Sequence, residues 1–438
     1  MASLKSVAFL FLVMICKFVK FSEPFSAAIH PKFLAPAPDF SPPISVSPTC
    51  SPVPYSPEPS TPPYLPSPSP SPAPSPTSYP PVPAASPIPQ GIKAAYWPSF
   101  DSFPASSIDT SFFTHIYYAF LLPEPNTFKL NITLLDQQKL FEFRIGLSAK
   151  NPPIQTILSI GGGGNDPDVF AQMASTQETR GAFINSTIEV ARTYEFNGVD
   201  LDWEFPATVN DMANLVLLFK EWRKALKIEA KTSGKPRLLL TSAVYYSPEF
   251  TSYGLSRSYP AHAIAKYLDW ASPMCYDYHG KWDNFTGIHS ALYDPNGTIS
   301  SSYGIGSWIR AGVPPKKLVM GLASYGHTWK LKDPNINGIG APAIGVGPGD
   351  EDGLYNYYAI VDFNNKNNAT VKFDSTTVSY YSYVGDSWIG YDEVGSIKLK
   401  VRFARFKGLA GYFFWALGYD KDWALSKQAA REWDYNKH

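Results

Sequence analysis

Three acids alternate with large apolar residues in the segment "GVDLDWEFP" at 198–206: Asp200, Asp202 and Glu204. Successive side chains of a β-strand point to opposite faces, so one face of this segment would be acidic and the other hydrophobic. Carboxylates two residues apart on one face repel each other, so at least one of them must have a raised pKa. A carboxylic acid that keeps its proton near neutral pH can protonate the oxygen of a glycosidic bond. The segment therefore predicts acid catalysis.

The spacing also assigns roles to the three acids. Glu204 has the longest side chain and lies nearest the end of the run, so we expect it to be the general acid and base. Asp202 would modulate it, and Asp200 would be the deeper member that shifts charge onto Asp202. Ordinary retaining glycosidases need a second carboxylate about 5 Å away as nucleophile, and stacked acids are poorly placed for that attack. A substrate whose own 2-acetamido group attacks the anomeric carbon would remove the need.

A metal site is the rival use of three acids. One strand alone offers poor oxygen geometry for a metal ion, and no histidine lies beside these acids in the sequence. We therefore expect neither a metal nor another cofactor.

The elements that must position these acids are eight β-like runs separated by helical segments. The runs lie at 94–97, 115–121, 155–162, 198–205, 237–246, 268–278, 317–326 and 408–417. Helical spacing is clearest at Leu215, Leu218, Phe219, Trp222 and Leu226, and Gly234 ends that pattern. This alternation predicts an α/β fold, a closed (β/α)8 TIM barrel with its catalytic groups at the carboxyl ends of the strands. The Tyr- and Gly-rich stretch at about 333–392 predicts a small α+β insertion between strands 7 and 8.

The first ninety residues have a different composition. Lys5 precedes an apolar run too short to span a bilayer, which predicts a secretory signal peptide at 1–28. Pro and Ser dominate 29–90, which predicts an extended linker, either a stiff spacer or a glycosylated stalk that associates with a cell wall. The folded domain would occupy 91–438. We expect a secreted protein of the extracellular space or cell wall, with the vacuole as a possible destination, and no membrane anchor.

Charge and composition narrow the ligand. Lys+Arg and Asp+Glu both number 37, so nothing favours nucleic acid or an anionic membrane as partner. Aromatic residues make up 15% of the chain, which suits a neutral ligand held by stacking, such as a sugar. Cys275 is the only cysteine of the predicted domain, so we expect it to be buried and inert. Five N-x-S/T triplets are compatible with a glycoprotein, at Asn131, Asn185, Asn284, Asn296 and Asn368.

Four motifs in order resemble glycoside hydrolase family 18. "FNGVDLDWEFP" resembles the family signature D-x-x-D-x-D-x-E, and "SIGG" at 159–162, "MCYDYHG" at 274–280 and "YFFWALGYD" at 412–420 resemble its motifs on three other strands. The resemblance runs from Gly91 to the C-terminus, and "YWPSF", "THIYYAFL" and the insertion are similar to plant class V chitinases. It implies a secreted enzyme that cleaves β-1,4 linkages between N-acetylglucosamine units of chitin or chitooligosaccharides by a retaining, substrate-assisted mechanism.

The resemblance also implies roles for single residues. Glu204 would be the proton donor, Asp202 would orient the acetamido group of the substrate, and Tyr276 would donate a hydrogen bond to its carbonyl. Further substrate-binding residues would be Trp415 as the floor beneath the sugar, with Met274, Asp277, Tyr96, Phe120, Trp282 and Tyr325 along the cleft. Strict alternation would put Tyr276 and Asp277 on opposite faces, so the strand must end or twist there.

One position departs from the family pattern. Asn197 stands where the signature has its first Asp. We expect Asn197 to hydrogen-bond Asp200 without exchanging a proton with it, and so to alter the pH dependence or slow turnover. This departure keeps an alternative open, a catalytically weak chitin-binding lectin or inhibitor on the same fold. The run "GGGG" at 161–164 predicts a tight backbone turn beside the cleft, since no lysine follows it as in a phosphate-binding loop.

Overall fold

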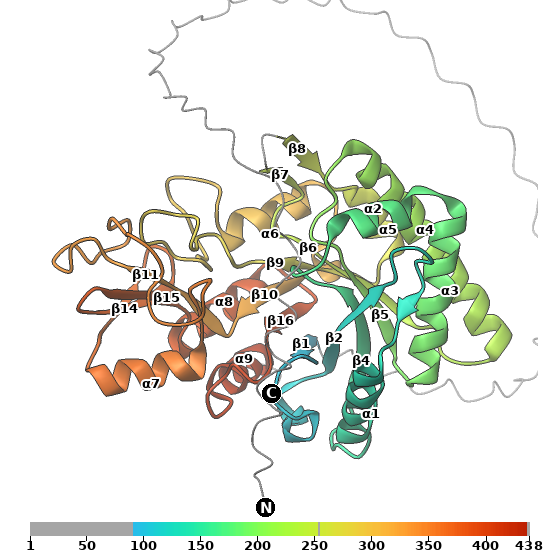
Figure 1. The fold of residues 1–438 in the computed structure, drawn as a ribbon, viewed down its shortest axis with the longest axis horizontal. Coiled ribbons are helices and arrows are strands. Elements are labelled where there is room, and N and C mark those ends of the chain that lie inside the picture. Colours follow the sequence, from blue (N-terminus) through green and yellow to red (C-terminus); the bar gives the residue numbers. More distant parts are fainter. Residues whose placement is uncertain (1–90, 253–254, 436–438) are drawn as a thin grey trace, which may run out of the picture. The chain divides into compact units, whose positions relative to one another are not determined.

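Eight parallel strands form a barrel in the computed structural model, which describes residues 91–252 and 255–435 (Figure 1). The strands are β1 (Ile92–Pro98), β2 (His115–Pro123), β4 (Gln155–Gly161), β5 (Gly198–Asp202), β6 (Leu239–Tyr245), β9 (Trp270–Met274), β10 (Val319–Ala323) and β16 (Gly411–Trp415). They pair in the order β10-β16-β1-β2-β4-β5-β6-β9, and a parallel bridge between Ala271 and Leu318 joins the two ends. The predicted TIM barrel is confirmed. The predicted signal peptide and linker lie outside the described residues.

Strand β5 has the two faces that its alternation predicts. Val199, Leu201 and Trp203 are buried in the main hydrophobic core, which lies between the barrel and its helices. Asp200 and Asp202 point the other way and are buried as well. The apolar back of the strand thus holds it in the wall, while its carboxylates face the inside of the barrel.

Helices cover the outside of the barrel (Figure 1). They are α1 (Leu134–Ser148), α2 (Pro167–Ser175), α3 (Gln177–Thr193), α4 (Val209–Ser233), α5 (Ala261–Tyr267), α6 (Ser301–Arg310), α8 (Val394–Phe406) and α9 (Ala424–Asp434). The helix predicted from its apolar spacing is α4. A reciprocal capping box of Thr208 and Asp211 starts it, and Gly234 ends it in the left-handed conformation at φ 71°. Short strands add to the rim: β3 (Leu130–Asn131) pairs with β2, and β7 (Glu249–Ser252) with β8 (Leu255–Ser258).

The insertion between the seventh and eighth barrel strands is a separate antiparallel sheet with one helix, α7 (Tyr357–Asn367). Its strands are β11 (Tyr325–Lys330), β12 (Leu354–Asn356), β13 (Thr370–Asp374), β14 (Ser379–Val384) and β15 (Ser387–Tyr391), in the order β12-β11-β15-β14-β13. Figure 1 shows this lobe, in orange, beside the barrel. It begins at Tyr325, earlier than the expected 333, because the chain leaves β10 at Ala323 and starts the new strand after a single residue.

A buried ion pair ties the end of the lobe to helix α8. Lys400 Nζ lies 2.6 Å from the Asp392 carboxylate, and the side chains are 2% and 0% exposed. The same ammonium donates to the backbone oxygen and the hydroxyl of Ser290. The buried ammonium therefore joins the end of the lobe and helix α8 to Ser290, which lies 110 residues before Lys400 in the sequence.

Replacing Lys400 by methionine should lower the free energy of unfolding by about 3–5 kcal/mol, because Asp392 would keep a buried charge without its cation. Urea denaturation of the full chain would measure this loss. The matched control is Lys330→Met, whose partner Asp386 is half-exposed at 3.7 Å, and this change should cost less than about 1 kcal/mol. Equal losses in the two variants would contradict the assignment.

Two further expectations concern the described residues. None of their helices combines the length and hydrophobicity needed to cross a membrane. Cys275 is buried without a disulfide partner, and burial raises the pKa of its thiol to about 12. The thiol therefore stays protonated and unreactive at neutral pH, as predicted.

Candidate active site

A cavity lies at the carboxyl end of the barrel, next to the acids of β5. Strand β5 ends at Asp202, and Glu204 lies just beyond it. Both residues line a cavity of ≈ 560 Å³ together with Tyr276, Asp277 and Trp415. These side chains come from strand ends that are far apart in sequence, which is where barrel enzymes place their catalytic groups.

Asp200 is the anchored member of the acidic row. Its carboxylate accepts hydrogen bonds from Thr241 at 2.6 Å, Ser159 at 2.7 Å and the Tyr96 hydroxyl at 3.0 Å. Ser159 and Thr241 are the residues paired with Asp200 on the neighbouring strands, so the barrel register delivers both donors. Burial raises the pKa of Asp200, and these three hydrogen bonds act against the rise. Asp200 is thus fixed beneath the cavity.

Asp202 has an unsatisfied oxygen at the cavity wall. Its Oδ1 is buried and has no hydrogen-bond partner among the described residues. Burial, followed by the charges of Glu204 and Asp200, raises the pKa of Asp202 well above its usual value. A buried polar atom without a partner is costly, so this oxygen is placed to bond a ligand.

Glu204 has the protonation properties of a general acid. Burial raises its pKa to about 7, and the negative charge of Asp277 adds to the rise. Near neutral pH the carboxyl therefore keeps its proton in a large fraction of molecules. A group that carries its proton at this pH can transfer it to a leaving oxygen.

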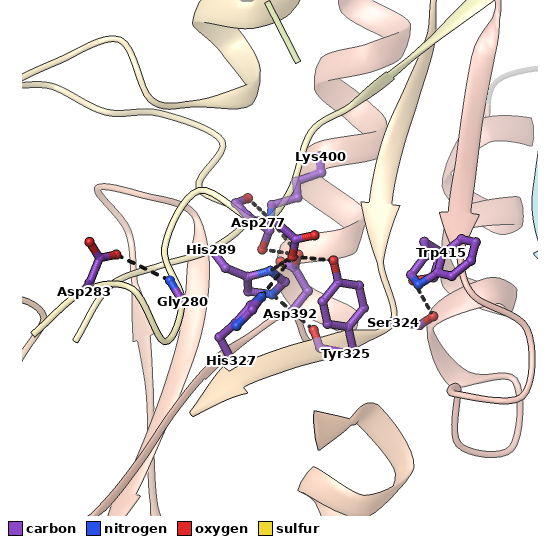
Figure 2. A network of polar contacts seen from close by, with 11 residues as sticks. Asp277, Gly280, Asp283, His289, Ser324, Tyr325, His327, Asp392, Lys400 and Trp415 are labelled. Carbon is purple, nitrogen blue, oxygen red and sulfur yellow. Dashed lines mark hydrogen bonds and ion pairs between the residues drawn. The ribbon is translucent and has the colours of Figure 1, made fainter. Parts of the chain in front are cut away.

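Asp277 is held by a polar network from the inserted lobe and from the loop after β9 (Figure 2). Its Oδ1 accepts hydrogen bonds from the Tyr325 hydroxyl at 2.6 Å and from His327 Nε2 at 2.9 Å, and His289 Nδ1 lies 3.6 Å away. Desolvation alone would raise the pKa of Asp277, but its interactions with the two histidines outweigh it and lower the pKa. Asp277 therefore stays ionised beside Glu204.

The backbone conformation explains how Tyr276 and Asp277, which are adjacent in sequence, can face the same cavity. Strand β9 ends at Met274, and Asp277 has a φ of 58°, in the left-handed region. Strict alternation no longer applies past the strand end, so Tyr276 and Asp277 both reach the cavity. The predicted strand end is confirmed.

The same cluster has the spacing of a metal site. One ligand atom each of Asp277, His289 and His327 lies within 4.8 Å of the others. Asp277 Oδ1, however, already accepts hydrogen bonds from Tyr325 and His327, and His289 Nε2 bonds the backbone oxygen of Tyr325 at 3.1 Å. These bonds explain the arrangement as a hydrogen-bonded support for Asp277, and we assign no metal to it.

Aromatic side chains form the wall of the cavity. Trp415 stacks on Phe120 with ring centroids 5.6 Å apart, and Met274 lies on the same lining. Tyr96 also reaches the lining but is only 1% exposed, so its main contact is the bond to Asp200. Trp415, Phe120, Met274 and Tyr96 thus share one cavity lining, and their binding of substrate stays a prediction.

Two predicted cleft residues, Trp282 and Tyr325, are absent from the lining of the first cavity. Trp282 is 60% exposed and lines a second cavity, of ≈ 920 Å³, which meets the first at Asp277. Tyr325 is buried, and its hydroxyl supports Asp277 instead of forming the cavity wall. Tyr325 therefore positions a cleft residue and is absent from the linings of both cavities.

The glycine run forms the predicted tight turn. Gly161 and Gly162 have φ values of 122° and 94°, which side-chain-bearing residues rarely adopt. A Cβ on Gly162 would lie 2.5 Å from the Phe120 ring, and one on Gly163 would lie 3.2 Å from a Glu204 oxygen. Glycine thus leaves the space in which Phe120 and Glu204 lie.

The expected contact between Asn197 and Asp200 is wrong. Asn197 precedes β5 at its amino end, where its exposed side chain accepts a hydrogen bond from the backbone N–H of Thr156 at 2.8 Å. Asp200 bonds three other residues inside the barrel. The departure from the signature therefore lies outside the acidic cavity, and it gives no reason to expect weak catalysis.

Sequence reasoning missed several residues of the site. His289 and His327 support Asp277, while Phe100, Leu122 and Leu135 line the first cavity. A histidine directly after the seventh β-like run was a usable signal for His327. No pattern in the sequence indicated that His289, in an irregular loop, would meet Asp277.

Comparison with known proteins identifies the family. The model of "Glycosyl hydrolases family 18" matches residues 93–420. "Class V chitinase CHIT5" of Lotus japonicus is 57% identical over 79% of this chain and 87% of its own length. "Nod factor hydrolase protein 1" of Medicago truncatula is 47% identical over 78% of this chain and 90% of its own length.

Solved structures agree with these sequence matches. A class V chitinase from Nicotiana tobaccum in complex with NAG4 has a TM-score of 0.76 at 39% identity, covering 78% of this chain and 99% of that one. The chitinase-like agglutinin RobpsCRA from Robinia pseudoacacia has a TM-score of 0.72 at 42% identity, over the same shares of the two chains. The chain belongs to glycosyl hydrolase family 18 and resembles the plant class V chitinases within it.

Proposed function

We propose that the protein is a secreted chitinase that hydrolyses β-1,4 linkages between N-acetylglucosamine units of chitin or chitooligosaccharides. The observation that carries the proposal is the pairing of Glu204, with its pKa raised to about 7, and the unsatisfied oxygen of Asp202 in one aromatic cavity. The relatives named chitinases and the neighbour solved with NAG4 support the substrate class.

The geometry supports a substrate-assisted reaction. A sugar lying over Trp415 would place its acetamido group between Asp202 and Tyr276, where Asp202 accepts its N–H and Tyr276 donates to its carbonyl oxygen. Glu204 then protonates the glycosidic oxygen while the acetamido oxygen attacks the anomeric carbon and forms an oxazolinium ion. The leaving sugar departs, and the resulting Glu204 carboxylate takes a proton from the water that opens the ion.

Incubating the full chain with chitin oligomers tests the proposal. We expect new reducing ends. The similarity to an agglutinin supports the alternative, a sugar-binding protein that does not cleave its ligand efficiently. Binding without new reducing ends would favour that alternative and overturn the hydrolase.

The products should first appear as the β anomer, because attack by the acetamido group and then by water inverts the anomeric carbon twice. Proton NMR of fresh digests would record the anomeric signals before mutarotation. An initial α product would contradict the mechanism even if cleavage occurs.

The alkaline limb of the pH profile should lie near pH 7, since Glu204 must be protonated to act and its pKa is raised to about 7. Asp277→Asn removes the negative charge that adds to this rise, so the limb should move to lower pH whatever happens to the maximal rate. The profile of kcat/KM against pH measures both. Asp283→Asn is the control, because Asp283 bonds His279 and does not line the cavity. An unmoved limb in Asp277→Asn would contradict the electrostatic role.

The secretory route is part of the proposal and depends on residues 1–28 alone. Expressing the full chain in plant cells and sequencing the N-terminus of the exported protein would test it. Recovery of an uncleaved protein inside the cytosol would overturn it.

A further inference from the structure

Helices α8 and α9 carry basic side chains on their outer surface. Four of them are exposed: Lys398 and Arg402 on α8, and Lys427 and Arg431 on α9. We call these four residues the basic face. Within each helix the two cations are four residues apart, so they lie one turn above each other and repel. The two helices pack together, and three of the four cations border the same hollow, so repulsion also acts between the helices.

Acidic neighbours do not offset this charge. The acids within the two helices are Glu432 and Asp434. Glu432 is buried and pairs with Arg402 Nε at 3.0 Å, while Asp434 pairs with Lys93. The other three members of the basic face have no ion-pair partner among the described residues. The face therefore keeps a positive charge, although the whole chain has 37 basic and 37 acidic residues.

The hollow beside the basic face has the groups that hold a charged sugar. Its volume is ≈ 210 Å³, and it is lined by Lys398, Arg402, Gln428, Arg431, Glu432 and Tyr435. Tyr435 is 60% exposed, so its ring is accessible beside the cations. An aromatic face packs on a sugar ring, an amide bonds its hydroxyls, and a guanidinium pairs with a carboxylate.

The packing of the two helices forms the hollow before any ligand binds. Arg402 and Arg405 reach from α8 to the last turn of α9, where they bond the carboxylate and the backbone oxygen of Glu432. Arg405 also donates to the backbone oxygen of Tyr435. These bonds hold the end of α9 against α8, with the cations and the ring in place.

We propose that the basic face binds an acidic polysaccharide, a sugar chain with a carboxylate on successive units. One unit would occupy the hollow, where Tyr435 packs on its ring and Arg431 pairs with its carboxylate. The remaining cations would pair with the carboxylates of neighbouring units, which a single sugar acid does not have. None of the residues of the hollow lines either cavity at the carboxyl end of the barrel, so the protein would hold this polymer while its cleft stays open.

Calorimetry of the full chain with polygalacturonate at low ionic strength tests the proposal, because salt screens exposed charges. The matched ligand is the methyl ester of the same polymer, which has the same sugar rings without the charge. We expect the acid to bind at least about tenfold more tightly than the ester, equivalent to about 1.4 kcal/mol. The double variant Lys398→Gln/Arg431→Gln should remove this preference without lowering the melting temperature, because it relieves repulsion.

The matched control variant is Lys220→Gln/Lys224→Gln. It removes the same charge from two exposed lysines four residues apart on α4, which do not line the hollow, and it should keep the affinity for the acid. Tyr435→Ala changes no charge but removes the ring, so it should weaken binding of the acid about threefold.

Three outcomes would overturn the proposal, and none depends on the cleavage of chitin. The first is equal binding of the acid and the ester, or binding of neither. The second is an equal loss of affinity in the two double variants, which would make the binding a property of any surface lysine. The third is tighter binding of phosphatidylserine vesicles or of a single-stranded oligonucleotide, lost in Lys398→Gln/Arg431→Gln, which would assign the basic face to a membrane or a nucleic acid.

Discussion

Cleavage of chitin oligomers should fall by about 10³-fold or more when Glu204 is replaced by glutamine. The amide keeps the size and shape of the side chain but has no proton that it can give to the glycosidic oxygen. Glutamine also carries no charge at any pH, so the cost of burying the side chain does not increase. Release of reducing ends would measure the rate, and calorimetry with the same oligomers should show affinity close to that of the parent protein.

The control for this substitution is Glu189→Gln, an exposed glutamate on helix α3 that should leave the rate unchanged. Near-parental cleavage by Glu204→Gln would show that another group supplies the proton. Loss of both cleavage and binding would indicate that the variant is misfolded, which its melting temperature would reveal.

The barrel could be predicted because its signals are local. Each of the eight runs alternates or buries its residues over a short window, and a helix such as α4 carries its own capping residues. The acids of β5 were informative for the same reason: Asp200, Asp202 and Glu204 share a face within one segment. The raised pKa of at least one of them could then be deduced from their mutual repulsion and their burial.

The support of the site depends on contacts between distant segments. Asp277 is turned toward Glu204 by a left-handed backbone and is held by side chains of β11 and of the loop after β9. Neither the turn nor the partners leave a periodic signal in the sequence. The lobe therefore contributes to the chemistry through Tyr325 and His327, although its sequence indicated only an insertion.

The error at Asn197 has a physical cause. The signature lists four positions as if they were equivalent, but a strand end separates them. Asn197 lies before the first residue of β5, outside the alternation that carries Asp200 and Asp202 inward. Its carbonyl and N–H pair with Leu239 and Thr156, so its place is in the outer end of the sheet.

Replacing Asp202 by asparagine should lower kcat by about 10²-fold with a small change in KM, because its carboxylate acts most strongly after the acetamido group has attacked. The oxazolinium ion is positive, and Asp202 Oδ1 is a buried oxygen that no described protein group satisfies. Burial and the charges of Glu204 and Asp200 raise the pKa of Asp202 in the free protein, and the positive charge of the oxazolinium ion would favour its ionised form. Asparagine retains an acceptor oxygen but removes the compensating charge. Steady-state kinetics on a chitin oligomer would separate kcat from KM.

The matched control at the other end of the strand is Asn197→Asp, which restores the acid of the family signature. Its rate and pH profile should stay within about twofold of the parental protein, because the side chain is exposed and bonds Thr156 instead of Asp200. If Asn197→Asp raised the rate strongly while Asp202→Asn lowered it little, the proton would have to pass along the whole row of acids. If the two variants behave as expected, catalysis is confined to the carboxyl end of β5. There Asp202 and Glu204 would contact the sugar, and Asp200 lies beneath them with its three hydrogen bonds.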